Sequence, residues 1–171
     1  ANVTTTGTQT YTGAVTLSGG NRTLTGSTIN TGSTLAGGNY SLTITGNADI
    51  DGAITGVTNL AISGTSNLGG NVTTTGTQTY TGAVILSGGN RTLTTTNSQI
   101  TFGNTVNSEA GQARALTASV GSSEVEFSGV VGGDVALGAI AVTGSLDLNA
   151  AISGAASLSV SDTSNLGANI T

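Results

Sequence analysis

The chain has 171 residues, of which only 6% are charged, and its formal net charge is −5. It contains no His, Cys or Lys, and its three basic residues are Arg22, Arg91 and Arg114. The composition excludes disulfide bonds and the His-, Cys- or Lys-activated nucleophiles of common hydrolases, and it argues against nucleic acid, which requires clustered Lys and Arg. Anionic membrane surfaces are disfavoured for the same reason, and no apolar run is long enough for a membrane span.

Repetition is the strongest feature of the sequence. Residues 2–25 recur at 71–94 with a single difference, Thr16 against Ile85, and residues 63–73 recur in similar form at 161–171. Such copies indicate an array of structural repeats. We therefore predict one solenoid over residues 1–171, with a first repeat at about 2–70, a second at about 71–168 and the start of a third at 169–171. The second repeat is longer by 29 residues, and this excess falls within about 96–134. Residues 1–4 also match 168–171, which suggests a segment of something longer.

Short alternating segments follow one another along the whole chain. Polar and apolar residues alternate in 8–17, 41–45, 59–63 and 124–128, and Gly residues separate such segments at intervals of about six or seven residues. This pattern predicts short β-strands joined by Gly turns. Only residues 109–118 leave room for a helix.

The alternation, and a comparison of the two long repeats with each other, predict which side chains face inward. Apolar residues replace apolar residues at the inward positions, whereas Thr43 becomes Ala141 and Asn59 becomes Ser157 at outward ones. The predicted core ladder consists of Tyr11, Val15, Leu17, Leu42, Ile44, Leu60, Ile62, Tyr80, Val84, Leu86, Ile140, Val142, Leu158 and Val160.

These features predict an all-β fold, a right-handed parallel β-helix, in which each coil pairs with the coils above and below it. We expect coils of about 19–24 residues and roughly seven to nine coils, with strands about 4.8 Å apart along the axis. The alternative is a left-handed β-helix built on hexapeptides, although the Gly spacing drifts from strict hexads. An antiparallel sandwich is the third choice.

Three segments of the chain resemble a known kind of bacterial repeat. Residues 4–15, 42–46 and 100–108 are similar to the repeats of filamentous-haemagglutinin-like bacterial adhesins, which are exported by two-partner secretion, and of their autotransporter relatives. The resemblance implies a β-helical shaft that is exported through an outer-membrane barrel to the bacterial cell surface. It further implies that the chain serves as an adhesin stalk or an extracellular fibre. A Lys-free surface rich in Thr, Ser, Gly and Asn also suits an extracellular location.

Two carboxylate pairs are the candidates for chemistry. Asp49 with Asp51, and Glu124 with Glu126, each lie two residues apart, and paired carboxylates can divide acid and base roles in glycoside cleavage. A solvated outer face is the simpler explanation, because the first pair becomes Asp147 and Asn149 in the second repeat. The chain also has few aromatic residues on which a sugar could stack. We therefore expect no enzyme and no catalytic residue.

A calcium loop is the only metal site that the sequence suggests. Residues 47–52 combine oxygen ligands with a Gly turn, which makes Asp49 and Asp51 weak candidates, but no bidentate Glu follows. The copy at 145–150 has lost most of these oxygens. We expect neither a metal nor a cofactor.

Outward Thr residues form the last candidate site. Thr-x-Thr pairs on a flat stack of coils would make a regular grid of hydroxyl and methyl groups, although Thr is also an ordinary surface residue of strands. The predicted surface array consists of Thr8, Thr10, Thr12, Thr77, Thr79 and Thr81. This array favours an ice-binding or glycan-binding solenoid as the alternative function.

The sequence thus predicts a non-enzymatic structural segment of an adhesin shaft or self-assembling filament. Its expected partners are adjacent repeats or further copies stacked end to end through strand ladders, with a host surface, abiotic surface or glycan met by the outer faces. The alternative is the Thr-array binding module, and the third choice is a β-helical polysaccharide-active enzyme.

Overall fold

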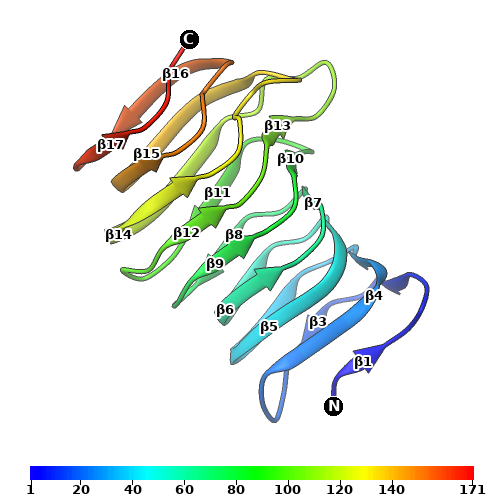
Figure 1. Cartoon of the computed structure of the whole chain (residues 1–171). Coiled ribbons are helices and arrows are strands. Elements are labelled where there is room, and N and C mark those ends of the chain that lie inside the picture. Colours follow the sequence, from blue (N-terminus) through cyan, green and yellow to red (C-terminus); the bar gives the residue numbers. More distant parts are fainter.

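The computed structural model describes all 171 residues as an all-β chain without a helix. Every strand pairing is parallel, and the chain winds into a stack of about eight coils, a β-solenoid as predicted (Figure 1). The parallel pairing rules out the antiparallel sandwich, whereas the right-handed winding stays a prediction. The strands are β1 (Val3–Thr4), β2 (Gln9–Tyr11), β3 (Val15–Thr16), β4 (Arg22–Thr31), β5 (Leu35–Ile50), β6 (Ile54–Ile62), β7 (Ser66–Leu68), β8 (Val72–Thr74), β9 (Gln78–Tyr80), β10 (Val84–Leu86), β11 (Arg91–Thr94), β12 (Ile100–Phe102), β13 (Val106–Ser108), β14 (Leu116–Phe127), β15 (Leu137–Leu148), β16 (Ala155–Val160) and β17 (Ser164–Leu166).

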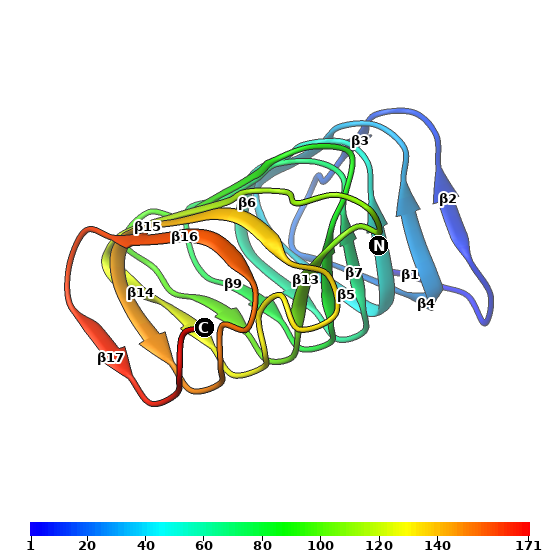
Figure 2. The same cartoon turned by 90° about the horizontal axis from the view of Figure 1, so that it is seen from above.

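The strand register divides each coil into three sides, which surround one interior (Figure 2). We name them by the first strand on each. Face A begins with β1 and includes β9, β12 and β17. Face B begins with β2 and includes β7, β10 and β13. Face C begins with β3 and includes β8, β11 and β16. The long strands β4, β5, β6, β14 and β15 turn a corner and contribute to more than one face.

Coil length varies along the stack. One of the shortest coils runs from Leu42 to its partner Leu60, and one of the longest runs from Leu93 to its partner Ala118. The first is shorter and the second is longer than any coil that the sequence predicted, so the expected range was too narrow at both ends. From residue 42 to 86 the first residue of each inward pair recurs every six residues, and only β6 departs from the pattern, because a register shift places Val57 inside in place of residue 56.

A single core runs along the inside of the stack. Its 33 buried apolar residues form one cluster. Most of the predicted core ladder lies within it: Leu17, Leu42, Ile44, Leu60, Ile62, Tyr80, Val84, Leu86, Ile140 and Val142. Tyr11, Val15, Leu158 and Val160 are only partly buried against the cluster, because they belong to end coils with a neighbour on one side.

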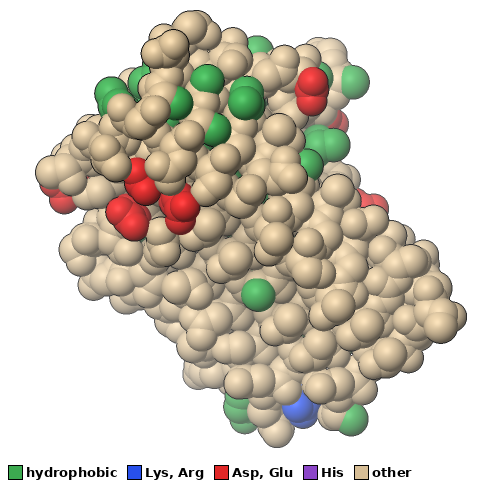
Figure 3. Space-filling model, viewed as in Figure 1, with side chains coloured by type: hydrophobic (Ala, Val, Ile, Leu, Met, Phe, Trp, Pro, Cys, Tyr) green, Lys and Arg blue, Asp and Glu red, His purple; other side chains and the backbone are tan.

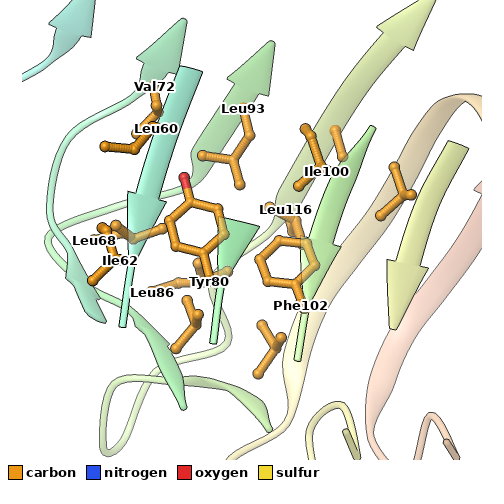
Figure 4. Close-up of a cluster of buried hydrophobic side chains, with 14 of the residues drawn as sticks. Leu60, Ile62, Leu68, Val72, Tyr80, Leu86, Leu93, Ile100, Phe102 and Leu116 are labelled. Atoms are coloured by element: carbon orange, nitrogen blue, oxygen red, sulfur yellow. The ribbon is translucent and has the colours of Figure 1, made fainter. Parts of the chain in front are cut away.

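Three aromatic rings stack along the inside of face A, and two of them were not among the predicted core residues. Tyr80 pairs with Phe102, and Phe102 pairs with Phe127. The ring centroids are 5.4 and 5.0 Å apart, with planes within 12° and 8° of parallel. Figure 4 shows the first of these pairs, Tyr80 with Phe102. The two Phe residues of the chain thus follow a Tyr in one column, where parallel register makes like side chains stack.

Glycine recurs at the corner between faces A and B, where successive coils lie close together. A Cβ atom on Gly26 would lie 2.7 Å from the Gly7 oxygen, and one on Gly64 would lie 2.6 Å from the Gly46 oxygen. Gly46 also has φ +132°, which side chains rarely adopt. Gly26, Gly46 and Gly64 are therefore corner residues that let backbone pack on backbone.

The 29-residue excess of the second repeat adds one coil. In the first repeat, three coils separate Val3 from Ile62, which both lie on face A. The chain then passes two further faces before Val72, the equivalent of Val3 in the second repeat. In the second repeat, four coils separate Val72 from Val160, which both lie on face C. The chain again passes two further faces before Ile170, so the second repeat has one coil more than the first. Longer turns account for those of the 29 additional residues that do not belong to the added coil. The possible helix at 109–118 was wrong, because these residues form a turn that leads into β14.

The aromatic stack yields a stability prediction. We expect Phe102→Ala to lower the free energy of unfolding by about 3–5 kcal/mol, because it opens a cavity between two stacked rings. Chemical denaturation monitored by circular dichroism measures this loss. Thr45→Ala, on the exposed side of face A, is the matched control and should change stability by less than about 0.5 kcal/mol. Equal losses in both variants would contradict the role of the stack.

Candidate binding surfaces

A buried Gln–Tyr pair closes one corner of the coil. Gln78 is fully buried, and its Nε2 donates to the Thr94 carbonyl at 2.9 Å and the Val72 carbonyl at 3.3 Å. The Tyr80 hydroxyl donates to Gln78 Oε1 at 3.0 Å. Each buried polar atom of the pair therefore has a partner, which removes the penalty of burying it.

The first repeat builds the same hydrogen-bonded pair at another corner, between faces A and B, whereas Gln78 lies at the corner between faces C and A. Gln9 Nε2 donates to the Thr25 carbonyl at 2.7 Å, and the Tyr11 hydroxyl donates to Gln9 Oε1 at 2.8 Å. Residues 8–11 and 77–80 therefore have the same structural role in the two copies, and this role of Gln was missed from the sequence. The signal was available, since Gln occupies an inward position two residues before an inward Tyr.

Outward Thr residues line up on face A. Thr23 pairs with Thr43, which pairs with Ala61, and the column continues through Thr79 to Thr101. A second column begins with Thr25 and Thr45. Neighbouring hydroxyls in a column are about 4.8 Å apart, the spacing of paired strands. Figure 3 shows that the surface in this view consists mainly of side chains that are neither hydrophobic nor charged.

The predicted Thr array does not form one grid. Thr79 lies in the face A column, with Thr77 and Thr81 on either side of β9. Thr8, Thr10 and Thr12 lie on or beside β2 of face B, where Thr10 pairs with Asn30 and the column continues to Asp49. The two sets lie on different faces because the repeat length is not a whole number of coils. Thr23 and Thr43 take the place beside Thr79 that the sequence had assigned to Thr10.

The Thr columns of face A give way to acidic residues toward the C-terminal end. Thr101 pairs with Glu126, which pairs with Asp147. Acidic side chains form a cluster on the surface seen in Figure 3. Gln99 Nε2 donates to Glu124 Oε1 at 3.0 Å and to Glu126 Oε2 at 3.2 Å, so an amide bridges the two carboxylates. Glu124 and Glu126 lie side by side on β14 and do not face each other across a groove.

Face B carries the other acidic candidates and a shallow groove. Asn67 Nδ2 donates to Asp49 Oδ1 at 2.8 Å, while Asp51 lies exposed just after β5. Two adjoining hollows of about 390 and 470 Å³ lie along this face and share Asn67 and Ile85. Ile85 is 45% exposed there, at the position where the first repeat has Thr16. No group of three or more His, Cys, Asp or Glu residues is arranged to hold a metal ion.

Both ends of the stack leave core residues uncovered. At the N-terminal end, a cavity of about 190 Å³ is lined by Val3, Tyr11 and Val15 among others. At the C-terminal end, Leu166 is 56% exposed and Ile170 is 45% exposed. Large apolar side chains are exposed almost only here, so the ends are the most hydrophobic surfaces of the molecule.

Comparison of the chain with models of known families, with curated proteins and with solved structures finds no match in any of the three. The solenoid fold is therefore established by the structure alone, and the resemblance to filamentous-haemagglutinin-like adhesins stays a prediction. The structure contains no helix with the length and hydrophobicity that crossing a membrane requires.

The Gln–Tyr corner yields a prediction of pH dependence. Burial raises the pKa of Tyr80 well above its ordinary value of about 10. The folded state therefore keeps the proton that the unfolded chain releases, so the stability from neutral Tyr80 is complete below about pH 10 and is lost as the pH rises toward the folded-state pKa. We expect Tyr80→Phe to be less stable by about 1 kcal/mol at pH 7, through loss of the hydrogen bond. Its stability should fall less steeply than the wild type between pH 9.5 and 11 in urea titrations. Equal slopes would contradict the assignment.

Proposed function

We propose that this chain is a non-enzymatic structural segment of a shaft in an extracellular bacterial adhesin or filament. One observation carries the proposal: two near-identical repeats are joined within one sheet and one core, with no break where they meet. Val72, at the start of the second copy, pairs with Ile54 of the first repeat and with Leu93 of its own. The seam between repeats is built like any other pair of coils.

A stack of this kind suits a mechanical role. Its 99 backbone–backbone hydrogen bonds include ladders between successive coils on all three faces, and these bonds run along the axis. Axial load is therefore shared by three ladders at each coil. Further repeats lengthen the shaft without requiring a larger core, because each coil contacts only its neighbours.

The outer surface supports an extracellular role. Only 6% of the residues are charged, and the faces consist largely of Thr, Ser, Asn and Gly. Such a surface stays hydrated without strong fields that would attract nucleic acid or anionic lipid. The resemblance of residues 4–15, 42–46 and 100–108 to adhesin repeats points to the same role. We assign contact with a host surface, an abiotic surface or a glycan to these outer faces.

A tandem chain tests the shaft. We join Thr171 directly to Thr5 of a second copy, so that residues 168–171 serve in place of residues 1–4. We expect one continuous rod that is longer by about 40 Å in solution scattering, and one unfolding transition at a higher temperature, because one pair of open ends is now covered. The control tandem keeps residues 1–4 and so contains four surplus residues. Two independent units with the stability of the single chain would contradict the proposal.

The Thr columns of face A favour a second candidate function, recognition of ice or a glycan by a flat hydroxyl array. Thr23, Thr43, Thr79 and Thr101 share one column and are interrupted only by Ala61. Parallel strands hold these side chains at a fixed spacing, so that a repeating ligand could meet several of them at once.

Bulky substitutions test this second candidate. We expect Thr43→Tyr and Thr79→Tyr to abolish inhibition of ice recrystallisation, because one large ring holds a flat ligand away from its neighbours. Thr10→Tyr, equivalent to Thr79 in sequence but placed on face B, is the matched control and should retain the activity. Wild-type protein without activity in this assay, and without retention on glycan arrays, would exclude the candidate.

A further inference from the structure

The seam between the two repeats shows how one coil of this sequence stacks on another. Residues 59–73 form the lower coil and residues 78–94 the upper one. Ala61 pairs with Thr79, Asn67 pairs with Ile85, and Val72 pairs with Leu93. This seam lies inside the molecule and is fully packed, with Leu60, Ile62, Leu68, Tyr80, Val84 and Leu86 all buried.

The two ends of the chain repeat the two sides of this seam. Residues 161–171 match 63–73 with three differences, at Asp162, Ala168 and Ile170. Residues 2–25 match 71–94 with one difference, at Thr16. The C-terminal end of one molecule thus presents the lower side of the seam, and the N-terminal end of another presents the upper side.

We infer that the C-terminal coil of one molecule binds the N-terminal coil of a second copy of this chain, head to tail, in the register of the internal seam. Ser159 then pairs with Thr10 of the second copy, Asn165 with Thr16, and Ile170 with Leu24. The inference rests on the proposed shaft function and specifies its partner and its register. In this register Leu166 and Ile170, which are exposed in the single chain, lie against the apolar cavity of the second copy.

One polar side chain at the N-terminal end, Arg22, lacks a partner that this contact would supply. Within the molecule, Arg91 Nη1 donates to the Gly69 carbonyl of the coil below at 2.6 Å. Its equivalent, Arg22, lies in the open end coil and donates only to nearby carbonyls, those of Ser18 and Asn21. In the seam register, the Gly167 carbonyl of the first molecule lies beside Arg22 of the second copy, as the Gly69 carbonyl lies beside Arg91 within one molecule. Arg22 therefore gains a charge-assisted hydrogen bond on assembly.

Assembly in this register requires a strand exchange. β1 pairs Val3 and Thr4 with Leu24 and Thr25 of the next coil, as Val72 and Thr73 pair with Leu93 and Thr94. Ile170 and Thr171 of the incoming molecule need the same place. Residues 1–4 are exposed, and they are the ones displaced.

The incoming strand, residues 168–171, can make the same hydrogen bonds as residues 1–4, which it displaces. Asn2 Oδ1 accepts the Thr23 amide at 2.9 Å, as Asn71 Oδ1 accepts the Thr92 amide at 3.0 Å. Asn169 occupies the equivalent position in the incoming strand. The net gain therefore comes from covering the two apolar ends, and residues 1–4 act as a competitor that weakens assembly.

The register also fixes the symmetry of the fibre. Val3 lies on face A, whereas Ile170, which takes the place of Val3 of the next molecule, lies on face B. Each added molecule is therefore rotated by one face, about a third of a turn, and advances by about 40 Å along the axis at the spacing of paired strands.

Engineered cysteines test the register directly, because the chain has none of its own. We mix Asn165→Cys protein with Thr16→Cys protein, and Ser159→Cys protein with Thr10→Cys protein, under mild oxidation. All four positions are exposed, and adjacent strands bring paired Cα atoms within disulfide reach. Both matched pairs should form disulfide-linked dimers. The crossed pairs, Asn165→Cys with Thr10→Cys and Ser159→Cys with Thr16→Cys, belong to different faces and should not.

Sedimentation velocity over a range of concentrations measures the association constant, and with it the contributions of Arg22 and of residues 1–4. Deletion of residues 1–4 should strengthen association, and Arg22→Gln should weaken it by about tenfold, the loss expected for one hydrogen bond to a charged group. Cross-linking of crossed pairs as efficiently as matched ones would overturn the register. If no pair cross-links while the Thr171–Thr5 tandem forms one continuous rod, the shaft proposal stands and association between separate molecules is excluded.

Discussion

The parallel backbone ladder is the constraint on which the rest of this structure depends. The N–H and C=O groups of the strands point along the axis and bond only to the coils before and after, so each strand residue is held in register with an equivalent one about 4.8 Å away. Side chains of one kind therefore gather in columns: Tyr80 with Phe102 and Phe127 inside, Thr23 with Thr43 outside. In the first and last coils of these 171 residues one edge of each ladder is unpaired, and an unpaired strand edge can pair with another strand.

A narrow interior explains the composition. Three sides enclose a space that Leu, Ile, Val and Ala fill, so the chain needs few large residues to bury 33 apolar side chains in one cluster. Polar side chains enter this interior at a few positions: Thr31 Oγ1 and Ser66 Oγ are buried without a hydrogen-bond partner, whereas the Gln78 amide has its partners. Gln78 holds two carbonyls from successive coils and accepts from Tyr80. Such a satisfied pair specifies one register at its corner, because a shifted strand would leave the buried amide without partners.

The mismatch between repeat and coil determines what the molecule displays. A repeat that begins on face A is followed by one that begins on face C, and the next begins on face B. Identical segments therefore point in three directions, and surfaces that are continuous along the shaft are assembled from different parts of the repeat. The Thr columns of face A combine Thr23 and Thr43 of the first repeat with Thr79 of the second. The longer second repeat preserves this rotation because its excess adds a whole coil.

The sequence by itself determined the fold class, the extent of the repeats and most of the core, because strand alternation and duplicated segments are local signals that a parallel stack turns directly into structure. Leu42, Ile44, Leu60 and Ile62 could be placed inside from alternation alone. The coil length could not, since shorter and longer coils fit the same alternation and only pairing across coils selects between them. The neighbours of Thr79, the aromatic column, the corner role of Gln78 and the incomplete partners of Arg22 likewise depend on which residues lie one coil apart, and that is decided by tertiary register.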